Sequence, residues 1–343
     1  SLAQKNALKQ IKLMNEVIEP KISKRIFKIL FIIIIFGFLI YILKNSKIII
    51  KILRKNKIAY LFLFPAFLIV FIVVFFPFFY NIIISFSNFS LKTFRDWNII
   101  GLHHYLDVLS DINFYYILLK TIIWTVVNLF FHTVIGISLA LLINRTLPVK
   151  PLLRTLLIIP WAIPQYISAL SWRGMFNQEY GSINILLGEL LSMDPIQWLS
   201  SPFEAFSACI LTNIWLGFPF MMIIALGGLQ SIPNDLYEAA EVDGASRWQK
   251  LRFITLPMIM PVMIPAIILG MIWTFNNINV VWLVSNGGEP ADQTHILVSY
   301  VYKSAFNLYR YGYAAALSMI IFIFLFFAGI FSIRQSNSTE SIY

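Results

Sequence analysis

Two long apolar segments of the sequence carry amide, glycine and aromatic residues at helical spacing. The pattern comprises Asn213, Gly217 and Phe220 in one segment and Gly270, Trp273, Thr274 and Asn277 in the other. Residues spaced in this way share one face of an α-helix. Amides and hydroxyls are costly at the middle of a membrane unless they pair or line a wet cavity. An aromatic ring can stack on a sugar while amides bond its hydroxyls, so the pattern predicts a sugar-binding cavity. Helix–helix packing, which also uses Gly, Thr and Asn, is the alternative.

Proline next to the first of these faces suggests a local opening of the backbone. Pro219 has no N–H to donate to the carbonyl of Trp215. We therefore expect the backbone beside Gly217 to open toward the cavity, as in transporters with interrupted helices.

A long polar run, Glu238–Pro257, lies between the same two apolar segments. Pro233 suits a first helical turn, and Gly244 suits the left-handed residue at a helix end. The expected helix runs through Leu236, Ala239, Ala240 and Asp243. Ser246 followed by Gln249 is a capping box for a second short helix, which Pro257 is expected to end. The run therefore predicts a helix, a glycine elbow and a second helix outside the bilayer, where another protein can dock.

Catalytic and metal-binding patterns do not occur in the sequence. There is no GxxxxGK[ST] loop, no Ser/His/Asp or paired-carboxylate cluster, and no Cys/His spacing typical of a metal site. The single Cys209 lies in an apolar run. His132 and Asn128 lie one turn apart in an apolar segment, and an interhelical hydrogen bond is the favoured interpretation over a proton relay.

Composition indicates an all-α, polytopic membrane protein. Of the 343 residues, 59% are hydrophobic and 12% are charged, against about 45–50% and about 25% in soluble domains. The net charge of +10 fits Lys and Arg retained in cytoplasmic loops. No long basic stretch free of apolar segments is present, so nucleic-acid binding is not expected.

Six apolar segments are long enough to cross about 30 Å of hydrocarbon. They lie near 60–84, 115–143, 152–175, 204–228, 259–283 and 311–334. A shorter segment at 26–43 brings the expected number to about seven transmembrane helices. A true span at 26–43 is favoured, although it would export the Lys-rich tail before it against the rule that keeps Lys and Arg on the cytoplasmic side. The alternative, that 26–43 enters the membrane and returns without crossing, stays open.

The distribution of Lys and Arg sets the orientation. Loops 44–57, 144–154 and 229–258 hold twelve Lys and Arg residues, whereas the alternate loops hold five. The run Glu238–Pro257 is therefore expected on the cytoplasmic side. The outer loops are short, so capture of a dilute solute requires a separate protein.

The polar run also resembles a known family. Glu238-Ala239-Ala240, Gly244 and Ile254-x-Leu256-Pro257 match, at every spacing, the motif of permease subunits of binding-protein-dependent ABC importers. The resemblance implies a type I ABC importer transmembrane domain over 60–335 with a coupling loop at 229–258, after an N-terminal region (1–59) and before a C-terminal tail (336–343). In this family the loop sits in a cleft of the ATP-hydrolysing subunit. The implied coupling residues are Glu238, Ala239, Ala240, Asp243, Gly244, Leu256 and Pro257.

Segments 213–220, 273–290 and 311–323 resemble the maltose/maltodextrin-type permease, the larger partner of a heterodimeric core. The implied substrate contacts are Asn213, Trp215, Leu216, Gly217, Phe220, Gly270, Trp273, Thr274 and Asn277. Phe220 stands where tyrosine is usual, Thr274 replaces an amide and Gly270 replaces a hydroxyl, so the pocket is expected to be less polar. Only 85–114 is available where the best-known member has a large outer domain.

The resemblance implies a permease subunit in the prokaryotic cell membrane that imports a sugar, such as a maltodextrin. The implied partners are a second homologous permease, two copies of an ATP-binding subunit and an extracytoplasmic solute-binding protein. ATP and Mg would be bound by the ATPase, and no cofactor by this chain. Another polar solute, such as glycerol phosphate or a different oligosaccharide, is the first alternative. An ion-coupled carrier is less favoured, because the central segments carry no Asp or Glu, and a membrane enzyme or a structural anchor fits the pattern less well.

Overall fold

The computed structural model describes residue 44, residues 55–145 and residues 148–340, with side chains described as far as residue 330. The apolar segment predicted at 26–43, and the polar tail before it, lie outside these residues. Apart from one isolated antiparallel bridge between Ser87 and Ile99, the regular structure of the described part is helical.

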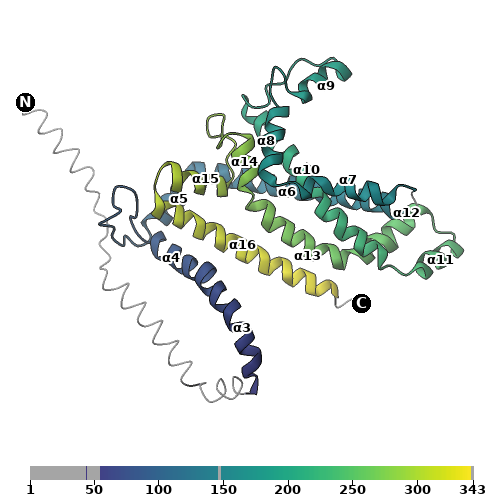
Figure 1. Ribbon diagram of the computed structural model, residues 1–343, viewed down its shortest axis with the longest axis horizontal. Helices are drawn as coiled ribbons and strands as arrows, with labels where there is room; N and C mark the ends of the chain where they lie inside the picture. The colour runs from purple at the N-terminus through teal and green to yellow at the C-terminus, as the bar shows by residue number, and fades with distance from the viewer. Residues whose placement is uncertain (1–43, 45–54, 146–147, 341–343) are drawn as a thin grey trace, which may run out of the picture. The chain divides into compact units, whose positions relative to one another are not determined.

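The described helices follow one another in the order labelled in Figure 1. They are α3 (Lys57–Val70), η1 (Phe71–Phe75), α4 (Phe76–Ser85), α5 (His103–Ser110), α6 (Ile112–Asn144), α7 (Lys150–Ala162), α8 (Gln165–Met175), α9 (Ser182–Leu191), α10 (Pro202–Gln230), α11 (Asn234–Val242), α12 (Arg247–Lys250), η2 (Leu251–Thr255), α13 (Leu256–Phe275), α14 (Ile278–Val284), α15 (Leu297–Tyr302), η3 (Lys303–Asn307) and α16 (Tyr311–Glu340). Those labelled η are short π-helical stretches.

Five helical runs of the described chain are long and apolar enough to cross a membrane. They are Lys57–Ser85, Ile112–Asn144, Pro202–Gln230, Arg247–Phe275 and Tyr311–Ile330. The pair α7 and α8 makes a sixth if it counts as one broken span. The all-α polytopic class is therefore confirmed.

The chain divides into two compact units. The first contains α3, η1, α4, α5 and residues 304–320. None of the most apolar window of Lys57–Ser85 is buried within the protein. A helix that is apolar all round is typical of a membrane span or of a helix surrounded by other helices.

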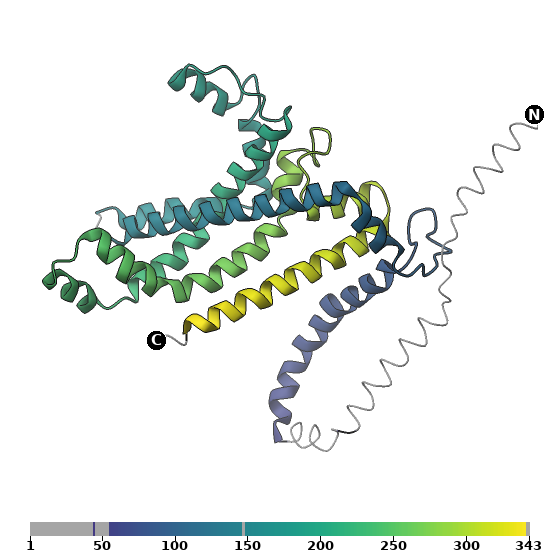
Figure 2. The same cartoon turned by 180° about the vertical axis from the view of Figure 1, so that it is seen from behind.

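The second unit is built around α10. This helix contacts α6, α7, α8, α13 and α14, and α6 and α13 run alongside it in both views (Figures 1 and 2). Two clusters of buried apolar side chains pack along it. One includes Met221 and Ile259, and the other includes Trp124 and Leu216. Helices α11 and α12 lie at one end of this unit, away from α8 and α14 (Figure 1).

Two predicted spans differ from the structure. The segment 152–175 is not one straight helix, because α7 and α8 meet at an angle of 91°. The segment 259–283 is displaced, because the helix begins at Arg247 and ends at Phe275, and α14 follows as a separate helix. Pro257 does not end the coupling helix. It occupies the first turn of α13, where its missing N–H is tolerated.

Candidate functional site

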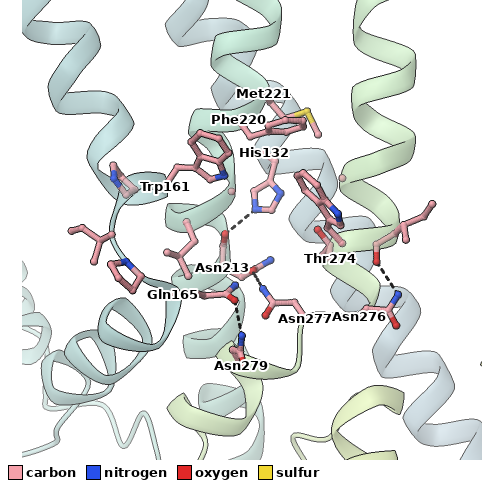
Figure 3. Close-up of a pocket in the computed structure, with 18 of the residues that line it drawn as sticks. His132, Trp161, Gln165, Asn213, Phe220, Met221, Thr274, Asn276, Asn277 and Asn279 are labelled. Atoms are coloured by element: carbon pink, nitrogen blue, oxygen red, sulfur yellow. Dashed lines mark hydrogen bonds between the residues drawn. The ribbon is translucent and has the colours of Figure 1, made fainter. Parts of the chain in front are cut away.

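A cavity of about 630 Å³ lies in the second unit, where two interrupted helices meet α6 and α10 (Figure 3). Its lining residues are His132, Pro160, Trp161, Ala162, Ile163, Pro164, Gln165, Asn213, Leu216, Gly217, Phe220, Met221, Gly270, Ile272, Trp273, Thr274, Asn276, Asn277, Ile278 and Asn279. None of them is Asp, Glu, Lys or Arg. The cavity thus combines amides and aromatic rings without a fixed charge among its described lining residues.

The first interruption separates α7 from α8. Ile163 and Pro164 are extended, with ψ of 137° and 129°, as expected for a residue before proline and for a proline outside a helix. This turn brings Trp161, at the end of α7, and Gln165, at the start of α8, to the cavity wall. Neither residue was predicted to line a cavity, although Pro164 signals a break in the helix at this point.

The second interruption separates α13 from α14. Asn276 follows the last residue of α13, and Asn277 has the non-helical ψ of 85° before α14 begins. Asn277 therefore does not continue the helix face of Gly270 and Thr274, as the spacing predicted. It still reaches the cavity, because the break turns it toward α10 (Figure 3).

An amide pair joins this break to α10. Nδ2 of Asn277 donates to Oδ1 of Asn213 at 2.8 Å. The remaining Nδ2 of Asn213 and Oδ1 of Asn277 are buried without a hydrogen-bond partner in the protein. Buried polar atoms of this kind are costly unless a ligand or water satisfies them. The pair therefore leaves one donor and one acceptor, the two functions that hydroxyl groups can satisfy.

His132 links α6 to α10 behind this pair. Its Nε2 lies 2.8 Å from the backbone carbonyl oxygen of Asn213. A Cβ on Gly217 would overlap the imidazole ring, so only glycine leaves room for it. This contact confirms the prediction of an interhelical hydrogen bond at His132. Asn128 instead donates to the carbonyl of Trp124 in its own helix.

Aromatic rings form another part of the wall. The ring of Phe220 lies 5.3 Å from that of Trp273 and 6.3 Å from that of Trp161, measured between centroids. The side chains of Trp161 and Trp273 remain about half exposed, at 51% and 52%. Exposed ring faces next to amides suit a ligand with both apolar and hydroxyl-bearing surfaces.

Most of the predicted cavity residues meet there. Asn213, Leu216, Gly217, Phe220, Gly270, Trp273, Thr274 and Asn277 all line the cavity. Trp215 does not, since its ring packs against Trp172 on the other side of α10, 5.7 Å between centroids. Pro219 leaves α10 as one helix from Pro202 to Gln230, so the expected opening of the backbone is wrong.

Two further amides were not predicted. Nδ2 of Asn279, in the first turn of α14, donates to Oε1 of Gln165 at 2.9 Å. This bond joins the two interruptions directly (Figure 3). Asn276 donates to the carbonyl of Ile272 in its own helix. Asn276 and Asn279 flank the predicted Asn277 in the sequence, but only the observed breaks bring Asn279 to Gln165.

The coupling loop has the predicted helix–glycine–helix form. Gly244 has φ of +76°, the left-handed conformation expected after a helix end. Ser246 and Gln249 form the capping box, with N–O distances of 2.7 and 3.3 Å. Lys250 donates to Glu241 at 2.5 Å across the elbow. The hydrogen bond and the positive charge of Lys250 lower the pKa of the exposed Glu241 carboxyl.

The coupling residues predicted from the family resemblance divide between the two sides of this elbow. Glu238, Ala239 and Ala240 lie in α11, Asp243 follows that helix, Gly244 forms the elbow, and Leu256 and Pro257 begin α13. Three apolar side chains nearby are exposed: Val242 at 89%, Trp248 at 64% and Phe253 at 69%. An exposed apolar group of this kind on a solvent-facing loop indicates a protein interface.

The sequence profile of the family described as "Binding-protein-dependent transport system inner membrane component" matches residues 132–336, which include both the cavity and the coupling loop. The chain belongs to this family. It is a multi-pass inner-membrane permease subunit of a binding-protein-dependent ABC importer, a transport component and not itself an enzyme. No cofactor is expected in such a permease, and no group of three His, Cys, Asp or Glu in the described residues is placed to hold a metal ion.

Two relatives of this permease are named as sugar transporters. It is 35% identical over 289 residues to the galactooligosaccharides transport system permease protein GanP of Bacillus subtilis (strain 168), covering 80% of this chain and 69% of GanP. It is also 35% identical over 271 residues to the trehalose/maltose transport system permease protein MalF of Thermococcus litoralis, covering 79% of this chain and 90% of that protein.

A solved structure confirms the importer fold. A chain in the crystal structure of a bacterial ABC transporter involved in the import of the acidic polysaccharide alginate superposes with a TM-score of 0.73. The sequence identity is 23%, and the match covers 84% of this permease and 98% of that chain. At this identity the likeness concerns the fold of the permease.

Proposed function

We propose that this permease subunit carries a neutral oligosaccharide through the cavity between α10 and the two interrupted helices. The observation that carries the proposal is the lining itself: amides and aromatic rings, with no Asp, Glu, Lys or Arg among the described residues. A volume of about 630 Å³ lies within the range of about 300–1,000 Å³ usual for small-ligand sites. The unsatisfied atoms of Asn213 and Asn277 add one hydrogen-bond donor and one acceptor.

The absence of charge in this lining argues against an anionic substrate. A phosphate or a carboxylate taken out of water needs a positive partner, commonly Arg or Lys. Glycerol phosphate and acidic polysaccharides therefore fit the cavity less well than a neutral sugar. The names of the two relatives, which specify galactooligosaccharides and trehalose/maltose, support the same substrate class.

The proposed partners follow from the coupling loop and the family. An ATP-hydrolysing subunit would dock on α11 and α12, where Glu238 and the exposed Val242 and Trp248 lie. A second, homologous permease would complete the path across the membrane. An extracytoplasmic binding protein would deliver the sugar, in keeping with the family description and with the alginate transporter solved in complex with its periplasmic protein.

A continuous helix connects the coupling loop to the cavity. The run Arg247–Phe275 passes without a break from α12 through η2 into α13. It ends at Phe275, between Thr274 and Asn277, which both line the cavity. Movement of α12 by the ATPase would therefore displace one wall of the cavity as a rigid element. The two states would differ in sugar affinity, which is what alternating access requires.

Purification of the assembled transporter from its native membrane tests this proposal. Mass spectrometry identifies the partner chains, and ATP hydrolysis by the complex with its binding protein is then measured with sugars of one length and different charge. Stimulation by a neutral oligosaccharide but not by the matching uronic-acid oligomer or by glycerol phosphate is expected. Stimulation by the anionic compounds alone would overturn the assignment.

A further inference from the structure

A second cavity, of about 790 Å³, lies within the first unit. Its walls are the loop after α4, one face of α5 and the residues that lead into α16. Its lining includes the charged and titratable side chains of Lys92, His103, His104, Asp107 and Arg310, with the ring of Tyr313. This cavity is separate from the sugar cavity, with which it shares no lining residue.

Backbone hydrogen bonds fix the shape of this second cavity. The N–H of Leu91 donates to the carbonyl of Tyr309 at 3.2 Å, and the N–H of Gly312 donates to the carbonyl of Phe89 at 2.8 Å. A Cβ at Gly312 would overlap the carbonyl oxygen of Ser87, so only glycine permits this approach. The two walls are therefore held together independently of the side chains that line them.

The lining carries an excess of positive charge. Lys92 and Arg310 line the cavity together with one carboxylate, Asp107, whose oxygens lie 3.8 Å from Nδ1 of His103 and 3.3 Å from Nδ1 of His104. The guanidinium of Arg310 stacks on the ring of Tyr313, 4.3 Å from its centroid. Stacking on an aromatic face orients the planar donor group. An oriented guanidinium with a nearby ammonium suits a phosphate, which accepts several charged hydrogen bonds.

The place of the cavity in the chain indicates where the phosphate comes from. The span that ends at Ser85 stops just before the first lining residue, and the span that begins at Tyr311 starts directly after Arg310. Leu106 and Leu109 of α5, and Leu102 just before it, are exposed at 61%, 48% and 58%, whereas Val108 is buried. A short helix with a leucine face beside two span ends fits the headgroup level of a bilayer.

The side of the membrane follows from the order of the spans. Helix α13 crosses from the coupling loop, and no candidate span of the described residues lies between it and α16. The start of α16 is therefore on the side opposite the coupling loop. We propose that the second cavity binds the phosphate of an anionic phospholipid in the outer leaflet, held by Arg310 and Lys92.

Native mass spectrometry of the whole transporter, purified and placed in nanodiscs, tests this proposal. Phosphatidylglycerol and phosphatidylcholine are supplied in equal amounts, and the lipid molecules retained after mild delipidation are counted. The proteins compared are the unaltered transporter, the single variants Arg310→Gln and Lys92→Gln, and the double variant that carries both changes. Arg95→Gln is the matched control, because Arg95 lies in the same loop but does not line the cavity. A fivefold or greater loss of retained phosphatidylglycerol in the double variant, with Arg95→Gln unchanged, is expected.

Two other results overturn the proposal. Equal retention of phosphatidylglycerol by all variants means that the cavity does not hold the lipid. If inorganic phosphate at low millimolar concentration displaces the retained phosphatidylglycerol, the site takes a free anion and the lipid assignment fails. Thermal melting of each variant checks folding, and Lys92→Gln alone, which removes an exposed side chain, keeps the test decisive if Arg310→Gln unfolds.

Discussion

Asn277 and Asn213 share a hydrogen bond of 2.8 Å that joins the interruption after α13 to the middle of α10. The bond uses one polar atom of each amide and leaves one donor and one acceptor buried without a protein partner. The pair lies at the end of the helix that begins in the coupling loop. It is thus the point at which motion of the loop would reach the proposed substrate.

The first prediction concerns Asn277→Leu. The change removes the donor to Asn213 and one atom available to a sugar hydroxyl, at a cost of about 1–3 kcal/mol. Sugar uptake at limiting concentration should therefore fall by about tenfold, while co-purification with the partner subunits stays normal. Asn276→Leu removes a neighbouring amide whose bond lies within its own helix, and its effect should be smaller. Uptake by Asn277→Leu equal to that of the unaltered protein would assign the pair to packing.

The second prediction concerns Gly217 and His132. Gly217→Ala places a Cβ in the imidazole ring, so the transporter should lose thermal stability. In a His132→Ala background the added methyl group has room. Gly217→Ala should therefore lower the free energy of unfolding less than it does in the unaltered protein, by a difference of more than about 1 kcal/mol. The melting temperatures of the four proteins measure this coupling. Equal costs in both backgrounds would show that the two residues are not in contact.

The third prediction concerns the coupling loop. Glu238→Lys reverses the charge on an exposed residue of α11, and the ATPase should no longer bind or should hydrolyse ATP without transport. Glu179→Lys makes the same change in the loop between α8 and α9 and should leave coupling intact. Co-purification and the ratio of sugar transported to ATP hydrolysed are measured for both. Normal transport by Glu238→Lys contradicts the proposed docking site.

The fourth prediction concerns acid stability and His295, which is buried in the loop between α14 and α15. Burial, opposed by the nearby Asp292 carboxylate, lowers its pKa from 6.5 to about 4. Between these values the unfolded chain binds a proton that the folded chain does not. Stability should therefore fall as the pH is lowered from 6.5 to 4, by on the order of 3 kcal/mol in total.

A substitution isolates this contribution. His295→Gln cannot take up the proton, so its melting temperature should fall less between pH 7 and pH 4.5. Titration of the Asp292 carboxyl does not interfere with this comparison. Burial opposes its ionisation, but the ion pair with Lys303 outweighs burial and lowers its pKa below 3.8. An identical acid loss in the variant and the unaltered protein would show that His295 does not contribute.

Local patterns in the sequence predicted the coupling loop well. Gly244 and the capping box of Ser246 and Gln249 are set by residues close in the chain, and the structure contains both. Hydropathy located the long spans for the same reason, since a span depends on a run of apolar residues. The prolines of 152–175 predict a kink, but not the division into two helices at 91°, because an apolar run containing proline fits both a kinked helix and two separate helices.

The cavity could be predicted only in part. Spacing alone correctly placed Gly270 and Thr274 on one helix face that lines the cavity. It also placed Asn277 on that face, but the helix ends before Asn277, which reaches the cavity from the break instead. The cavity role of Trp215 came from the family resemblance, whereas in the structure its ring packs on the opposite side of α10. Gln165 and Asn279 were missed because their meeting depends on two breaks far apart in the sequence, which only the packed structure brings together.

The most direct test of the account is ATP-driven uptake into proteoliposomes that contain the complete transporter and its binding protein. A neutral oligosaccharide and the uronic-acid oligomer of the same length are compared in the unaltered protein and in Asn277→Leu. The uncharged cavity lining predicts at least about tenfold preference for the neutral sugar, because an unpaired charge is costly to bury, and a reduced rate in the variant. Equal or faster uptake of the acidic oligomer, with no effect of Asn277→Leu, would contradict it.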